Sequence, residues 1–168
     1  MRDPQPPTIL VRGVNWLGDA VLSTPALLRL RAAQPEAHIS ILTEAKLADL
    51  WRHHPAIDSV LTFAKGESIW TIASRLREKR FQIGLVLTNS PRSALEVWLA
   101  RIPRRLGYAG GGRSWFLTEA IPRPPDAIEM RKRSVREIQQ LIVSHPRLPP
   151  AQFPATAHHL RHYMRLVS

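Results

Sequence analysis

The chain has no cysteine among its 168 residues, so it can form neither a disulfide nor a thiolate metal site. This absence is compatible with a reducing compartment. The first eight residues contain an acid and three prolines in place of the apolar stretch of a secretory signal, so we expect no export. No window approaches the roughly 20 apolar residues of a transmembrane helix. The sequence therefore predicts a cytoplasmic protein, or one that binds a membrane surface from the cytoplasmic side.

Acidic residues are scarce. The chain has 13 aspartates and glutamates against 24 lysines and arginines, which gives a formal net charge of +11. This excess favours an anionic partner, but charge alone does not identify it. Nucleic acid, an anionic membrane surface and a phosphorylated sugar substrate all fit. With 44% hydrophobic residues, the chain can bury one good core and fits a single domain.

Apolar segments of strand length alternate with helical patterns along the chain. The predicted strands are residues 8–12, 38–43, 57–63, 82–88, 102–108 and 115–121. The first predicted helix starts at residue 19. Further helices are predicted at residues 44–54, 68–79 and 93–100, and a basic helix at residues 128–143. Strands that alternate with helices are typical of an α/β fold with a doubly wound parallel sheet.

The stretch at residues 9–28 predicts a strand, a tight loop and a helix in succession. Gly13 and Gly18 bracket the loop, and Gly18 lets a ligand approach the backbone closely. Asp19 lies at the carboxyl end of the first strand and beside the first helix, where open α/β sheets bind ligands. An aspartate at a helix start is also a common cap, and position alone favours the cap.

A second polar loop follows the strand at residues 82–88. Asn89, Ser90, Arg92 and Ser93 lie just beyond this strand and open the next helix. Their side chains, together with free N–H groups at the helix start, can hold sugar hydroxyls and an anion. Asn-Ser-Pro is just as commonly a simple turn and helix cap.

A third candidate is the basic, glycine-rich segment from Arg101 to Arg113, which has four arginines and no acid. It is either a solvated basic face or an anion-binding patch on the same rim as Asp19. Its three consecutive glycines lack the Lys-Ser/Thr of a phosphate loop and the spacing of a dinucleotide fingerprint, so we expect no cofactor site.

Histidines near the end of the chain include one pair at helical spacing, His158 and His162. Two such imidazoles can share a helix face as metal ligands. No HExxH pattern accompanies them, and no acid follows Glu137, so a basic, solvated helix is favoured and no metal site is predicted.

Three segments carry recognisable motifs in a fixed order. They are RG-x-NWLGD followed by STPAL at residues 12–27, NS-x-RSAL at residues 89–95, and IPRR-x-GY at residues 102–108. Together they resemble glycosyltransferase family 9, the lipopolysaccharide heptosyltransferases, and most of all the heptosyltransferase II branch. The resemblance extends over roughly residues 8–121.

The resemblance implies a GT-B arrangement, in which two Rossmann-like halves face each other. It makes residues 1–125 the Rossmann-like, acceptor-binding domain of the amino-terminal half. Residues 126–168 are expected to form the basic helix, a proline-rich linker and the start of a further helix. The nucleotide-sugar domain of the carboxyl-terminal half is expected to be absent from the 168 residues.

The family transfers heptose from ADP-heptose to a hydroxyl of the lipopolysaccharide inner core, with inversion. By resemblance, Asp19 is the general base of this transferase reaction, and no metal or cofactor takes part. The residues expected to line the acceptor side are Asn15, Trp16, Gly18, Asn89, Ser90, Arg92, Ser93 and Arg113. The implied partners are the anionic, lipid-linked core acceptor, the inner-membrane surface and, only with a second domain, ADP-heptose.

A different class of function also fits the charge: a non-catalytic α/β module that binds an anionic membrane surface or nucleic acid through its arginines. A nucleic-acid binder needs exposed aromatic rings among its basic groups. Trp115 and Phe116 beside Arg113 are the only such grouping in the sequence, so nucleic acid is not the expected partner. The 168 residues alone are expected to bind acceptor weakly and to transfer nothing.

Overall fold

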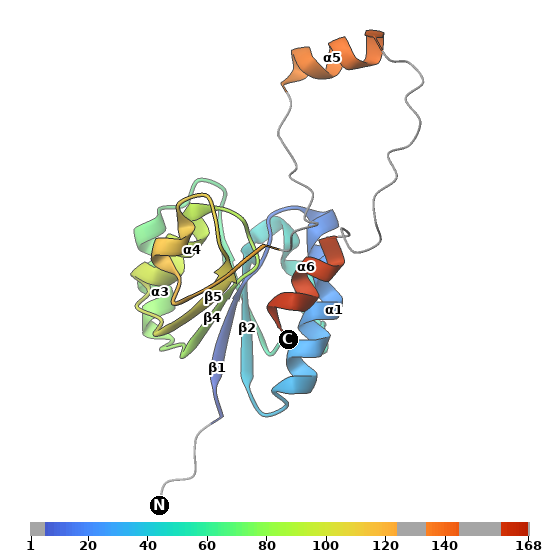
Figure 1. Ribbon diagram of the computed structural model, residues 1–168. Helices are drawn as coiled ribbons and strands as arrows, with labels where there is room; N and C mark the ends of the chain where they lie inside the picture. Colours follow the sequence, from blue (N-terminus) through green and yellow to red (C-terminus); the bar gives the residue numbers. More distant parts are fainter. Residues whose placement is uncertain (1–5, 124–133, 145–158, 168) are drawn as a thin grey trace, which may run out of the picture.

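The computed structural model describes residues 6–123, 134–144 and 159–167. Its centre is a six-stranded, fully parallel sheet in the order β3-β2-β1-β4-β5-β6, with helices on both faces (Figure 1). The strands are β1 (Thr8–Arg12), β2 (His38–Glu44), β3 (Ser59–Phe63), β4 (Ile83–Val86), β5 (Arg104–Tyr108) and β6 (Glu119–Ile121). The doubly wound, Rossmann-like α/β fold expected from the sequence is confirmed.

The helices follow the strands closely in the chain. They are α1 (Leu17–Ala33), α2 (Ala48–Trp51), α3 (Ile69–Glu78), α4 (Pro91–Leu99), α5 (Val135–Ser144) and α6 (His159–Leu166), with short 3₁₀ turns η1 (Ala45–Leu47) and η2 (Arg113–Phe116). None of the described helices is long and apolar enough to cross a membrane.

The core has two layers because β1 is buried on both faces and its side chains alternate between them. Ile9 and Val11 pack in the cluster formed with α1 and α6. Leu10 packs in the other cluster, with apolar residues of α3 and α4. Helices α1 and α4 therefore pack on opposite faces of the sheet, as Figure 1 shows.

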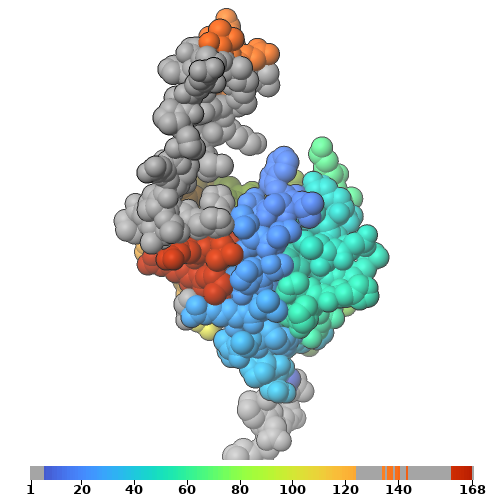
Figure 2. Space-filling model, turned by 90° about the vertical axis from the view of Figure 1, so that its right-hand side faces the viewer, coloured from blue at the N-terminus to red at the C-terminus, as the bar shows by residue number. Residues whose placement is uncertain are grey.

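The end of the described chain returns to the first helix. Helix α6 packs against α1, where Tyr163 and Leu166 are buried in the same cluster as Ile9 (Figure 2). The Tyr108 hydroxyl donates to the carbonyl of His162 at 2.6 Å, which ties α6 to β5. The domain boundary expected at residue 125 stays a prediction. Helix α6, which lies beyond that boundary, packs in the same hydrophobic core as the residues before it.

Several predicted elements start at other residues in the structure, and the first helix is one of them. Helix α1 begins at Leu17, so Gly18 and Asp19 lie in its first turn and Trp16 is the N-cap residue. Asp19 is therefore not the N-cap residue of α1. Gly18 is also not among the glycines with a positive φ, and a Cβ added there would meet nothing within 4 Å. Its backbone does not require glycine.

The strand predicted at residues 115–121 is wrong in its first half. Arg113–Phe116 form η2 after Gly112, which adopts the left-handed conformation at a φ of 73°. Only Glu119–Ile121 pair with β5, in β6. For the predicted basic helix, residues 128–133 lie outside the described residues. The whole proline-rich linker, predicted between Pro146 and Pro154, also lies outside them. The described α5 begins after Ser134, whose hydroxyl and backbone exchange hydrogen bonds with Glu137 in a capping box.

Candidate functional site

Two polar loops meet at the carboxyl edge of the sheet, where β1 and β4 are neighbours. Arg12 pairs with Val86 in the parallel register, and the Leu87 N–H donates to the Arg12 carbonyl at 3.2 Å. The loop after β1 leads into α1 on one face, and the loop after β4 leads into α4 on the other. This β1/β4 junction is the topological switch point, the usual ligand-binding position in such sheets.

A buried ion pair fixes the first loop. The Arg12 guanidinium Nε lies 2.7 Å from Glu96 Oε2 of α4, and both side chains are no more than 2% exposed. Arg12 Nη1 also donates to the Gly13 carbonyl at 2.6 Å and to Asn15 Oδ1 at 3.1 Å. The ring of Phe63 lies 4.5 Å from the Arg12 Cζ. Arg12 therefore joins α4, β3 and the loop that leads to Asp19.

The same carboxylate also holds the second loop. Arg92 Nε lies 3.3 Å from Glu96 Oε1, and Arg92 Nη2 donates to the Glu67 carbonyl in the β3–α3 loop. The Arg92 side chain is still 52% exposed. Glu96 thus joins a buried and a half-exposed arginine, and Arg92 presents positive charge to solvent beside the switch point.

The predicted residues of the first loop form an open rim. Asn15 and Asp19 are partly buried, whereas Trp16 is 73% exposed and Gly18 is exposed. Lys46 Nζ lies 5.8 Å from the centre of the Trp16 ring and adds a cation to this rim.

Asp19 lies near the buried tyrosine of α6. Burial raises the pKa of Tyr163 well above its usual value, and the charge of Asp19 raises it further. The position in the first turn of α1 places the carboxylate where the helix dipole favours negative charge. An aspartate in this position can accept a proton from a bound hydroxyl.

The second loop divides into open and buried residues. Asn89 is exposed, and Ser90 is the N-cap of α4 but makes no capping hydrogen bond with its side chain, so its hydroxyl does not serve as the predicted cap. Pro91 occupies the first helical turn, where its missing N–H costs nothing. Ser93 is buried at 2% exposure, on the inner side of α4. The structure therefore brings Asn89, Ser90 and Arg92 to the rim, but not Ser93.

Arg113 lies inside the protein rather than on its rim. It is 1% exposed and donates to the carbonyls of Tyr108, Thr88 and Ala109. Burial lowers the pKa of Arg113 to about 10, and the charge of Arg123 adds to this effect. Its observed contacts hold the loop after β5 against the start of the β4–α4 loop. The sequence suggests an exposed basic-aromatic group of Trp115, Phe116 and Arg113. This expectation is wrong for Arg113, because its guanidinium is buried.

Sequence reasoning missed two of the buried ionic groups of the site, Arg12 and Glu96. Arg12 ends an apolar strand and Glu96 stands in the apolar run Ala94 to Leu99. A lone charge inside an apolar segment is the signal that could have found them, because such a charge needs a partner. In the described part of the chain, no three histidine, aspartate or glutamate side chains are close enough to hold a metal ion.

Comparison with known proteins supports the three motifs. No profile of a known protein family matches the chain. Over 125 residues the chain is 34% identical to lipopolysaccharide heptosyltransferase 2 of Salmonella typhimurium. The aligned region covers 71% of this chain and 36% of that enzyme. It is 26% identical over 132 residues to lipooligosaccharide heptosyltransferase 2 of Haemophilus ducreyi, covering 76% and 38% of the two chains.

Solved structures show the same fold. The ADP-heptose lipopolysaccharide heptosyltransferase II of E. coli superposes with a TM-score of 0.71 at 24% identity, covering 96% of this chain and 40% of that one. A family 9 glycosyltransferase of Veillonella parvula gives a TM-score of 0.68 at 20% identity, covering 98% and 41%. The chain thus spans between 34% and 38% of the length of the curated relatives it matches. Its sequence motifs, its homologues and its fold agree, and the chain belongs to glycosyltransferase family 9, the lipopolysaccharide heptosyltransferases.

Proposed function

We propose that these 168 residues are the acceptor-binding part of an inverting heptosyltransferase. The observation that supports this proposal is that two polar loops follow the neighbouring strands β1 and β4 at the switch point. Arg12, which holds the loop before Asp19, and Arg92, which follows Asn89, share the carboxylate of Glu96. The relatives are named for lipopolysaccharide and lipooligosaccharide heptosyl transfer. The acceptor is accordingly an anionic, lipid-linked core oligosaccharide, and the donor is ADP-heptose.

In the proposed reaction, a hydroxyl oxygen of the acceptor attacks the anomeric carbon of the donor heptose. The bond from this carbon to the diphosphate oxygen breaks, and ADP leaves on the opposite face with the bonding electrons. The carboxylate of Asp19 takes the hydroxyl proton as the new glycosidic bond forms, which is a general-base role. This single displacement inverts the anomeric carbon.

The other rim groups hold the acceptor in place. The amide of Asn89 and the hydroxyl of Ser90 suit sugar hydroxyls, and the half-exposed Arg92 suits a phosphate or carboxylate of the core. Asn15 is oriented by Arg12, so its amide is held ready for a hydroxyl. Arg113 serves indirectly, because it holds the Thr88 carbonyl next to Asn89. Since the acceptor is lipid-linked, we place the protein at the cytoplasmic face of the inner membrane.

Calorimetry on the purified 168 residues tests the proposal. We expect binding of a heptose-bearing core fragment and no binding of ADP-heptose. Asp19→Asn should keep acceptor binding within about threefold, because the amide preserves size and hydrogen bonding. Asn89→Ala should weaken it by about tenfold, the loss of one or two hydrogen bonds.

Asp49→Asn is the matched control, since Asp49 lies on α2 and pairs with Arg52 outside the site. Its acceptor affinity should equal that of the unaltered protein. Binding of ADP-heptose without binding of the core fragment would overturn the assignment of these residues to acceptor binding. The Asp19 role is tested by transfer in an assay supplied with the partner half of a family member, where Asp19→Asn should abolish product.

A further inference from the structure

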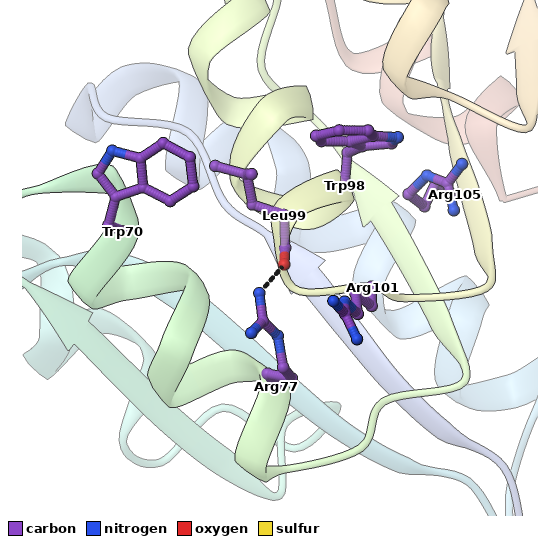
Figure 3. A pocket seen from close by; sticks show the side chains of 6 residues that line it. All are labelled: Trp70, Arg77, Trp98, Leu99, Arg101 and Arg105. Carbon is purple, nitrogen blue, oxygen red and sulfur yellow. Dashed lines mark hydrogen bonds between the residues drawn. The ribbon is translucent and has the colours of Figure 1, made fainter.

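Helices α3 and α4 cover the face of the sheet opposite α1 (Figure 1). A groove lies between these two helices (Figure 3). Its volume is about 520 Å³. The groove is lined by two tryptophans, one leucine and three arginines: Trp70, Trp98, Leu99, Arg77, Arg101 and Arg105. None of these six residues belongs to the rim around Asp19, and none is acidic.

The aromatic rings of this face are open to solvent. Trp70 is 68% exposed and Trp98 is 46% exposed. Trp115, on the η2 turn that packs against α4, is 88% exposed. The ring of Phe116 lies 5.9 Å from that of Trp98 and extends the aromatic surface. Several exposed large rings on one face mark an interaction surface rather than an ordinary solvated one.

The three arginines of the groove have different roles. Arg105 donates to the carbonyls of Ile102, Pro103 and Phe116, so it is used inside the fold. Arg77 Nη2 donates to the Leu99 carbonyl at 2.7 Å and ties α3 to α4. Arg101 is exposed and follows α4 in the left-handed conformation, at a φ of 59°. The groove therefore presents Arg101, and the remaining donors of Arg77, beside the exposed tryptophans (Figure 3).

We propose that this Trp70–Trp98–Arg101 face docks on the surface of an anionic lipid bilayer. Tryptophan favours the interface between acyl chains and headgroups, and arginine attracts anionic headgroups. The net charge of +11 and the lack of acids in the groove give the surface a charge complementary to such a membrane. The proposal rests on the proposed function, whose acceptor is lipid-linked.

The position of the groove relative to the site supports this occupant. Helix α4 begins at the Asn89–Arg92 loop and ends at the groove, and its nine residues span about 13 Å. A membrane on this face therefore keeps the switch point close to the lipid surface. Nucleic acid is a poorer occupant, because Arg105 is engaged internally and aliphatic Leu99 lies between the two rings (Figure 3).

Co-sedimentation with vesicles tests the proposal on the full 168 residues. One vesicle set is phosphatidylcholine alone, and the other adds phosphatidylglycerol; neither contains lipopolysaccharide. We expect binding to the anionic set only. Trp70→Ala with Arg101→Glu should weaken binding by about tenfold or more, through loss of an interfacial ring and reversal of one charge.

The matched control is Leu28→Ala with Arg29→Glu on α1. Both residues are exposed, the charge change is identical, and α1 lies on the opposite face of the sheet. This control should lose less than about threefold, since it alters the overall charge but not the proposed docking face. Far-ultraviolet circular dichroism and thermal melting establish that both double variants are folded.

Three results would overturn the proposal: no binding of the unaltered protein to anionic vesicles, equal losses in the two double variants, or tighter binding of a single-stranded oligonucleotide that depends on Trp70 and Arg101. Calorimetry with the soluble core fragment contains no bilayer. A failure of vesicle binding is therefore distinguishable from a failure of acceptor binding.

Discussion

Replacing Glu96 with glutamine should destabilise the protein strongly although it exchanges only one carboxylate oxygen for an amide group. Glu96 is 1% exposed and is the carboxylate that faces Arg12, itself 2% exposed. Glutamine keeps an acceptor oxygen but removes the charge, so the Arg12 guanidinium remains buried without a counter-ion. Breaking such a pair costs about 3 kcal/mol or more of unfolding free energy. A typical domain has only about 5 to 15 kcal/mol in total.

Urea unfolding followed by circular dichroism measures this loss. The control is Asp49→Asn, which breaks the exposed Asp49–Arg52 pair and should cost about 0.5 kcal/mol or less. If Glu96→Gln lies within about 1 kcal/mol of the unaltered protein, the buried pair does not have the assigned role.

A double variant separates stability from function. Arg12→Met with Glu96→Leu replaces the pair by apolar side chains of similar length and should recover most of the stability. Acceptor affinity should not recover with it, because Asn15 and the Gly13 carbonyl lose the guanidinium that holds them. Recovery of both properties would mean that Arg12 does not position the loop.

Three further predictions concern packing and titration. Gly84→Ala should cost about 1 to 3 kcal/mol in urea unfolding, because the new Cβ would lie 2.5 Å from Val97 Cγ1 of α4, and adding Val97→Ala should restore part of the loss. Burial raises the pKa of both Tyr108 and Tyr163, so an absorbance titration should show both tyrosines ionising at higher pH in the native protein than in urea. Folding then favours the protonated phenols, so this stability is complete below about pH 10 and is lost as the pH rises above it; a native group titrating at the ordinary value would contradict the packing of α6. For Asp58, partial burial raises the pKa, but hydrogen bonds from a strand N–H and a helix arginine lower it more, so its stabilising effect is present at neutral pH and lost as the pH falls below about 4. Asp58→Asn should accordingly lower the melting temperature at pH 7 and have little effect at pH 2, and equal shifts at both pH values would refute the linkage.

The fold could be predicted from the sequence because its signals are local. The apolar run of β1 and the polar break after it depend on neighbouring residues, and the observed bounds Thr8–Arg12 match the prediction. The same holds for α3, whose apolar stripe and Ser68 cap are contained within about a dozen residues. The order of strands and helices then limits the topology to a few parallel arrangements.

The pairing of the buried ionic groups could not be predicted because the partners are distant in sequence. Arg12 and Glu96 are 84 residues apart, and no local pattern pairs them. Arg113 occurs beside three glycines, a context typical of an exposed loop, yet its guanidinium satisfies buried carbonyls of the β4 and β5 loops. The groove at Trp70 and Trp98 combines two helices that each look like an ordinary amphipathic surface helix.

The separation of Arg12 from Glu96 also has a consequence for the newly made chain. At about 5 to 20 residues per second, a ribosome needs about 4 to 17 s to add the 84 residues between them. During that time β1, α1, β2 and β3 have emerged, but the side of β1 that later receives β4 lacks its neighbour and Arg12 lacks its counter-ion. We expect the nascent chain to remain incompletely folded, and open to chaperone binding along β1, until α4 has been synthesised.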